Sequence, residues 1–173
     1  MKVSDINKQE HDEHTSYYLD LVPAGDFEEE LKQSTQRVIA FFTAIPVPLH
    51  DYRYAEGKWT IKDVLQHMID VERIFAYRAL RFARKETASL PGFDVDDYGI
   101  AAETDRRSMP ELIEEYRVNR QSTLLLFQSF TPEMLIRSGI ASGDIISVRA
   151  AGCKLIGHEI HHCKIIKERY LSQ

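Results

Sequence analysis

Histidines are the residues of this chain whose type and spacing could bind a metal ion, and there are seven of them. His158 and His162 are four positions apart in the run GHEIHH. At that spacing two side chains lie on one face of a helix, with Cβ atoms about 5–6 Å apart. Two neutral imidazoles so placed can bind one divalent ion. His158 and His161, three apart, also meet this requirement.

Helical phase favours the pair His158 and His162. At about 100° per residue, the apolar residues of this segment gather around the direction of Val148. From that direction His162 lies about 40° away, His158 about 80° and His161 about 140°. The first two therefore face the interior or its margin, whereas His161 faces outward.

A third histidine, His67, lies at the margin of the apolar stripe of an earlier helical pattern. Three imidazoles without a fourth protein ligand leave positions open for water or substrate, as in catalytic zinc sites. We therefore predict one divalent ion on His67, His158 and His162, with zinc as the first choice and nickel as the alternative. The other interpretation is a hydrogen-bonded core His67 and a solvated pair on the last helix.

The run HEIHH also matches HExxH, in which two histidines bind zinc and the glutamate is the general base of a metalloprotease. A large class of these proteases carries Gly and a third His further along the chain. Those two positions are Ile165 and Glu168 here. No sheet is predicted either, so we do not favour a protease.

Charged residues interrupt the apolar stripes of three predicted helices, at Glu72, Arg120 and Glu159. An unpaired buried charge is costly, so we predict that these residues form one mutually paired set beside the metal site. Glu72 and Arg120 would orient the imidazoles from behind, and Glu159 is a candidate catalytic group. If the helices are mis-phased, these side chains instead reach outward along the surface.

Four long amphipathic patterns predict the helices that would position these residues. They begin at Asp26, Thr60, Ser108 and near Ser147, and the second and fourth extend to about Lys85 and Tyr170. The first three starts carry an acidic residue three positions on, as in a capping box. Arg78 belongs to a basic cluster at the C-terminal end of the second pattern, where the helix dipole favours cations. No strand alternation is evident.

The predicted fold class is all-α: a four-helix bundle with a long crossover connection and an N-terminal arm, in a single domain over residues 1–173. Residues 86–107 form the crossover. A connection of that length in a compact domain is often functional, so we expect it to line a substrate pocket. Residues 1–25 are interpreted as an arm or a short extra helix packed on the outside.

Composition excludes several classes of function. The net charge of −5 argues against a nucleic-acid-binding protein and gives no reason for docking on an anionic membrane. No apolar run approaches the roughly 18 residues of a membrane span, and no secretory signal is visible. Cys153 and Cys163 are about 15 Å apart on one predicted helix, too far for a disulfide. We expect reduced thiols in a cytoplasmic protein, with a catalytic thiol as the alternative.

The two histidine-bearing segments resemble the helix signatures of the DinB-like family of metalloenzymes. These segments are KWTIKDVLQHMIDVERIFAYRALRFAR and SVRAAGCKLIGHEIHHCKIIKERY. The resemblance extends to the connecting pieces SYYLDLVP, DYRYAEGKW and LPGFDVDDY, and so covers the chain from Tyr17 to Tyr170. It implies a four-helix bundle with a three-histidine metal site, whose ligands fall on His67, His158 and His162.

Characterised relatives in this family include bacillithiol S-transferases and mycothiol-dependent isomerases. The resemblance therefore implies a thiol-dependent S-transferase for a small-molecule substrate, with a low-molecular-weight thiol bound to the metal as thiolate. The alternatives are a metal-dependent hydrolase with a metal-activated water and a non-catalytic metal- or small-molecule-binding protein. The substrate, and the choice between a monomer and a homodimer, are left open.

Overall fold

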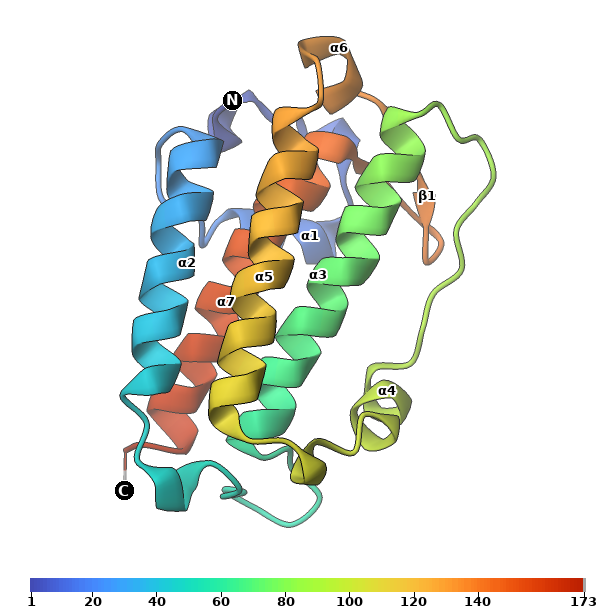
Figure 1. The fold of residues 1–173 in the computed structure, drawn as a ribbon. Coiled ribbons are helices and arrows are strands. Elements are labelled where there is room, and N and C mark those ends of the chain that lie inside the picture. Colours follow the sequence, from blue (N-terminus) through green and yellow to red (C-terminus); the bar gives the residue numbers. More distant parts are fainter. Residues whose placement is uncertain (173) are drawn as a thin grey trace.

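Four long helices form a bundle in the computed structural model, which describes residues 1–172 (Figure 1). They are α2 (Phe27–Thr43), α3 (Ile61–Ala83), α5 (Met109–Gln128) and α7 (Val148–Arg169). Each begins directly after a predicted start residue. The side chains of Asp26, Thr60, Ser108 and Ser147 accept hydrogen bonds from backbone N–H groups of the first turn. The predicted fold class and helix starts are thus confirmed.

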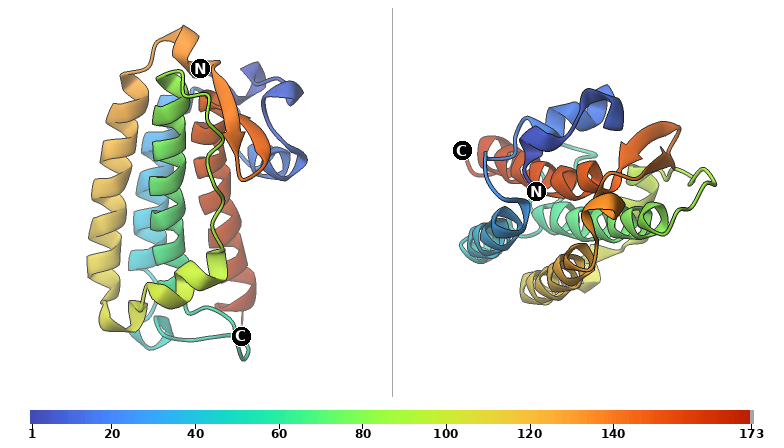
Figure 2. Two further views of the ribbon diagram at one scale, coloured as in Figure 1. Left: turned by 90° about the vertical axis from the view of Figure 1, so that its right-hand side faces the viewer. Right: turned by 90° about the horizontal axis from the view of Figure 1, so that it is seen from above.

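The bundle places the consecutive helices α2 and α3 diagonally, because α5 and α7 each pack against both of them (Figure 2). In Figure 1, α3 and α5 both run upward and α7 runs downward. Because α3 and α5 are neighbours that run in the same direction, the chain must return along the length of the bundle between the end of α3 and the start of α5. Residues 84–108 do this, as the predicted crossover, and include the unpredicted short helix α4 (Val95–Ala101).

The N-terminal residues form the predicted arm, which packs on the outside of α7. Its main element is α1 (Glu13–Leu19), and the short helix α6 (Pro132–Leu135) lies in the connection after α5. A glycine permits the close approach of the arm. A Cβ atom at Gly157 would lie 2.0 Å from the carbonyl oxygen of Tyr18, so any larger residue at position 157 would push α1 away from α7.

The expectation of no strands is wrong at one place. Strands β1 (Ser138–Ala141) and β2 (Asp144–Ser147) form an antiparallel hairpin beside α3 and α7. Its turn residues, Ser142 and Gly143, have φ values of 58° and 92°. Positive φ at both turn positions is typical of a type I′ hairpin. Four residues per strand are too few for an alternating pattern to stand out in the sequence.

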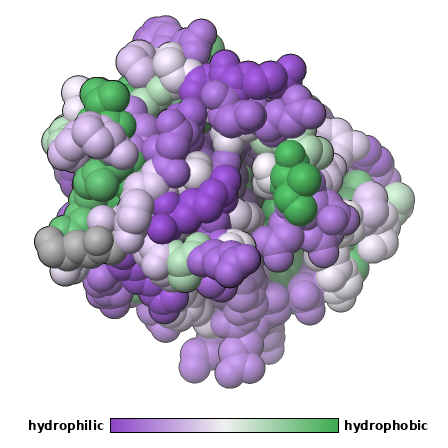
Figure 3. All heavy atoms as spheres, turned by 90° about the horizontal axis from the view of Figure 1, so that it is seen from below, coloured by the Kyte–Doolittle hydropathy of each residue, from purple (hydrophilic) through white to green (hydrophobic). Residues whose placement is uncertain are grey.

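Within residues 1–172, none of the helices is long and apolar enough to cross a bilayer. On the face seen in Figure 3, hydrophobic side chains form small patches separated by hydrophilic ones. Scattered apolar residues of this kind are normal for a protein surface.

Arg120 of α5 is buried in the bundle and forms ion pairs with two carboxylates. Its guanidinium donates two hydrogen bonds of 2.8 Å to Glu72 of α3 and one of 2.7 Å to Glu159 of α7. The Tyr116 hydroxyl donates to the same oxygen of Glu159 at 2.7 Å. Burial by itself lowers the pKa of Arg120, but the two carboxylates outweigh it and raise that pKa above its ordinary value. The structure thus brings the three charged residues together across three helices.

Removal of this guanidinium should destabilise the fold. Arg120→Ala is expected to lower the free energy of unfolding by about 3–5 kcal/mol, because two buried carboxylates lose their counter-charge. Arg117→Ala, on the exposed side of the same helix, is the matched control and should cost about 0.5 kcal/mol or less. Urea denaturation followed by circular dichroism measures both values. Equal losses of unfolding free energy in the two variants would contradict a stabilising role for the Arg120 ion pairs.

Candidate metal centre

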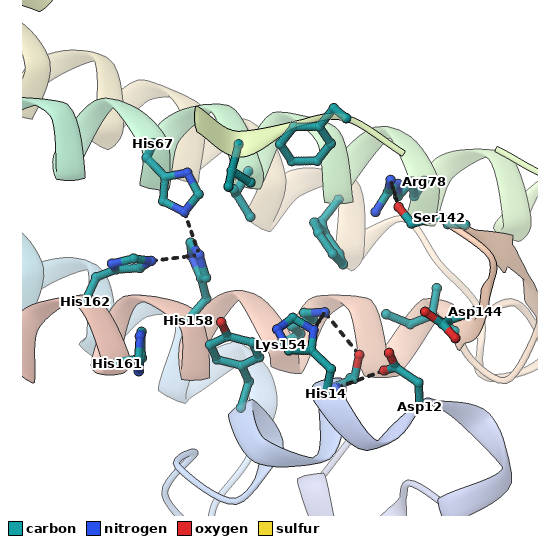
Figure 4. Close-up of a pocket in the computed structure, with 18 of the residues that line it drawn as sticks. Asp12, His14, His67, Arg78, Ser142, Asp144, Lys154, His158, His161 and His162 are labelled. Atoms are coloured by element: carbon teal, nitrogen blue, oxygen red, sulfur yellow. Dashed lines mark hydrogen bonds between the residues drawn. The ribbon is translucent and has the colours of Figure 1, made fainter. Parts of the chain in front are cut away.

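The three predicted ligand histidines point toward one another from α3 and α7 (Figure 4). Nε2 of His158 lies 3.1 Å from Nε2 of His67 and 3.0 Å from Nε2 of His162. One candidate ligand atom from each residue lies within 4.8 Å of the other two. His158 and His162 are one helical turn apart on α7, and His67 faces them from α3. The geometry suits a shared ion, and their role as ligands stays a prediction.

The donor chemistry of this cluster fits a divalent cation. Burial lowers the pKa of His67 to about 4 and that of His162 to about 3. Burial, followed by the neighbouring imidazoles, lowers the pKa of His158 well below its ordinary value. All three rings are therefore neutral at pH 7, each with one N–H and one lone pair. Nε2 of His158 can serve only one of its two neighbours well, whereas a cation would take a lone pair from each ring.

His161 lies beside the cluster but is held by the arm. Its Nδ1 is 2.9 Å from the hydroxyl oxygen of Tyr17, and its ring contacts Tyr17 and Tyr18 edge-on. It is partly exposed and does not belong to the three-histidine cluster. This placement agrees with the helical phase, which turned His161 away from the other two.

A cavity of about 400 Å³ opens from the histidines and extends between α3 and α7. The arm lines it with Thr15 and Tyr18, and the hairpin lines it with Ile146. Phe93 and Val95 of the crossover also line it, as predicted for that connection. The volume lies within the usual range for sites that hold one small molecule.

The charged set Glu72, Arg120 and Glu159 lies outside this cavity. Among residues 1–172, the hydrogen bonds of its side chains end on one another, on Ser34 and on Tyr116, and none reaches an imidazole. Glu159 follows His158 in the sequence, but its carboxylate is bonded to α5. The catalytic role of Glu159 and the orienting role of the other two stay predictions, while the geometry assigns all three to holding helices together.

Two cations that sequence reasoning left out of the site line the cavity, Lys154 and Arg78. Arg78 was placed only in a basic cluster at the C-terminal end of its helix, and it is 5% exposed. It lies on the same face of α3 as His67, eleven residues further on. Lys154 is 8% exposed and precedes His158 by one turn. The four-residue spacing of Lys154, His158 and His162 was the signal that could have revealed it.

The cysteines take no part in the site. Cys153 and Cys163 are free, as predicted, and neither lines the cavity. Burial raises the pKa of each thiol to about 12, so both stay protonated at neutral pH. The structure therefore does not favour the alternative of a catalytic thiol.

Two single substitutions test whether His158, rather than His161, binds the metal. His158→Ala should abolish metal binding, because its Nε2 is central to the cluster. His161→Ala should retain most of the metal, because its ring is bonded to Tyr17. Mass spectrometry of the metal content of untagged protein measures both. Loss of metal in both variants would instead favour His158 and His161, three residues apart, as the ligand pair, and retention of metal in His158→Ala would contradict the predicted site.

Acid should destabilise the metal-free protein between pH 6.5 and pH 5. Unfolded histidines take up protons below a pKa of about 6.5, while buried His67 and His162 stay neutral down to about 4 and 3. The unfolded state thus binds more protons in this window, and the free energy of unfolding falls as the pH falls. Urea denaturation at each pH measures the slope. The doubly substituted H67Q/H162Q protein should show a smaller slope, and an unchanged slope would contradict the assignment.

Solved structures show the same fold at low sequence identity. YfiT from Bacillus subtilis, described as a "probable metal-dependent hydrolase with an unusual four-helix bundle topology", has a TM-score of 0.71 at 18% identity, over 82% of this chain and 84% of that one. The mycothiol-dependent maleylpyruvate isomerase has a TM-score of 0.62 at 9% identity, over 98% of this chain and 63% of that one.

Sequence comparison gives the family. A curated protein of Oceanobacillus iheyensis, named a "putative metal-dependent hydrolase", is 29% identical over 117 residues. The match covers 66% of this chain and 66% of that protein, slightly less than two thirds of its length. The sequence profile of the DinB superfamily matches residues 30–166, which include all three histidines of the cluster. With most of its length matched, the chain belongs to the DinB superfamily.

Proposed function

We propose that this protein is a metal-dependent enzyme that acts on a small molecule, and that His67, His158 and His162 hold its divalent ion. The convergence of three neutral imidazoles at a cavity of about 400 Å³ supports this proposal. Zinc is the first choice and nickel the alternative, because imidazole ligands suit both ions.

Hydrolysis is the reaction that we propose first. A divalent ion in such a site supplies a Lewis acid and lowers the pKa of a water or a thiol that reaches it. The cavity volume suits one small molecule with water, whereas thiol transfer needs a thiol and an acceptor together. The name of the Oceanobacillus relative points to the same reaction. Thiol-dependent S-transfer, which the sequence resemblance implies, is the second candidate because it would use the same open histidine site.

The residues around the histidines position the rings and limit the access of water. The Trp59 ring lies 4.7 Å from the ring of His67, and the Tyr18 ring lies 5.6 Å from that of His158. Both aromatic side chains also line the cavity that the three histidines face. A substrate bound in the cavity would therefore meet the nitrogen cluster with its reactive group.

Metal analysis and an activity panel test this proposal together. Untagged protein should contain about one equivalent of a divalent ion. We expect turnover of esters, amides or lactones without added thiol, loss of turnover on chelation, and recovery when metal is restored. A second set of assays contains a thiol (glutathione, cysteine or bacillithiol) together with a chlorinated or epoxide acceptor.

The two sets of substrates separate the candidate reactions. Turnover that requires a thiol would replace hydrolysis by S-transfer. Full metal content with no turnover in either set would contradict an enzymatic function and favour a binding protein. His162→Ala should lose both the metal and the activity. His50→Ala is the matched control and should lose neither, because the His50 ring is hydrogen-bonded to the Ile45 carbonyl and does not line the cavity.

A further inference from the structure

Two buried cations line the histidine cavity without a carboxylate partner. Lys154 is 8% exposed and Arg78 is 5% exposed, yet within residues 1–172 neither forms an ion pair. Comparable buried cations elsewhere in the chain are paired: Lys62 lies 2.6 Å from Asp51, and Arg120 contacts two glutamates. Lys154 and Arg78 therefore differ from Lys62 and Arg120, which are buried beside carboxylate partners.

Neutral groups hold both cationic heads in place. The Lys154 ammonium donates to the Thr15 hydroxyl at 3.1 Å, and one Arg78 Nη donates to Ser142 at 2.7 Å and to the Pro91 carbonyl at 3.1 Å. Both heads lie near the Phe75 ring, at 4.9 Å for Lys154 and 5.0 Å for Arg78. The Nε and the second Nη of Arg78 have no hydrogen bond within the described chain, so they remain able to donate to a bound molecule.

The acids of the cavity do not neutralise these charges by contact. Asp12 accepts a hydrogen bond from the Thr15 backbone and caps α1, and Asp144 is exposed on the hairpin. Burial lowers the pKa of Lys154 to about 8, although Asp12 acts in the opposite direction. At pH 7 most molecules thus carry two buried positive charges here. A buried charge without a partner is costly, and a bound anion would remove that cost.

The two cations follow the histidines along the same helix faces. Lys154 lies one turn, about 6 Å, from His158 along α7, and Arg78 lies three turns, about 16 Å, from His67 along α3. Because the two helices run antiparallel, both cations lie on one side of the cluster. Figure 4 shows the order along the cavity: the three histidines, then Lys154, then Arg78. Phe75 gives the cavity an apolar wall beside the cations.

We propose that Lys154 and Arg78 bind the carboxylate of a small-molecule substrate, whose reactive bond then lies at the three histidines. The inference rests on the proposed function and names the substrate class, a small organic acid with an apolar segment next to its carboxylate. Hydrogen bonds from an ammonium and a guanidinium to a carboxylate are charge-assisted and strong. They would fix the acid end of the substrate, while Phe75 contacts the apolar part.

Calorimetric titration of metal-free protein at pH 7 tests the proposal with two probes of equal shape, 3-phenylpropionate and 3-phenylpropanamide. Chelation removes direct binding of the carboxylate to a metal. The acid should bind about tenfold or more tightly than the amide, as expected for hydrogen bonds to a charged group. Lys154→Met and Arg78→Met should each remove most of this preference, with a much larger loss in binding of the acid than of the amide. Lys164→Met, on the exposed side of α7, is the matched control and should retain the preference.

Several results would overturn the proposal. These are equal binding of the two probes, no detectable binding of the acid, and a preference for the acid that survives in both variants. Lys154→Met should also keep or raise the melting temperature, because it removes an unpaired buried charge. A large fall would show that the ammonium is structural. Since none of these measurements needs metal or turnover, an inactive protein that prefers the acid would refute the proposed function and leave the carboxylate site intact.

Discussion

Arg120 carries a positive charge into the interior of the bundle, where it needs carboxylates from two other helices. Glu72 lies on α3, five residues after His67, and Glu159 directly follows His158 on α7. A shift of either helix along α5 would separate the guanidinium from a carboxylate, at a cost of several kcal/mol. The same alignment places His67 opposite His158. The ion pairs therefore fix the distance across which the imidazoles meet, although they touch none of them.

Helix α7 lies between the packed core and the cavity. Among residues 1–172, buried charges are paired in the core and unpaired in the cavity. Successive residues on a helix point about 100° apart, so Glu159 turns toward the packed core while His158 turns toward the cavity. In the core, the Arg120 charge is balanced by carboxylates and the result is a fixed alignment of helices. In the cavity, the Lys154 and Arg78 charges are left unbalanced beside neutral imidazoles. The first arrangement stabilises the fold, and the second leaves binding energy for a ligand.

Local signals in the sequence were enough to predict the helices and the inward-facing pair His158 and His162, because capping and phase depend on residues a few positions apart. The addition of His67 from another helix rested on the family resemblance as well. The hairpin and α4 were missed because each spans too few residues for a periodic pattern. The diagonal placement of α2 and α3 depends on which helix faces pack against each other. The sequence of a single helix does not contain that information. Arg78 was left out of the site because its contacts with the crossover and the hairpin, at Pro91 and Ser142, join segments far apart in the sequence.

The three histidines at one end of the cavity and the residues of its walls belong to different kinds of structural element. The histidines stand on long helices whose alignment is fixed, whereas much of the wall comes from the arm, the crossover and the hairpin. Segments of that kind tolerate substitution and insertion far better than packed helices do. Descendants of one ancestral bundle can therefore diverge in the molecules that they accept while they inherit the same nitrogen cluster. Position 157 is an exception, because a Cβ atom there would meet the backbone of Tyr18 and push the arm, which forms part of the wall, away from α7.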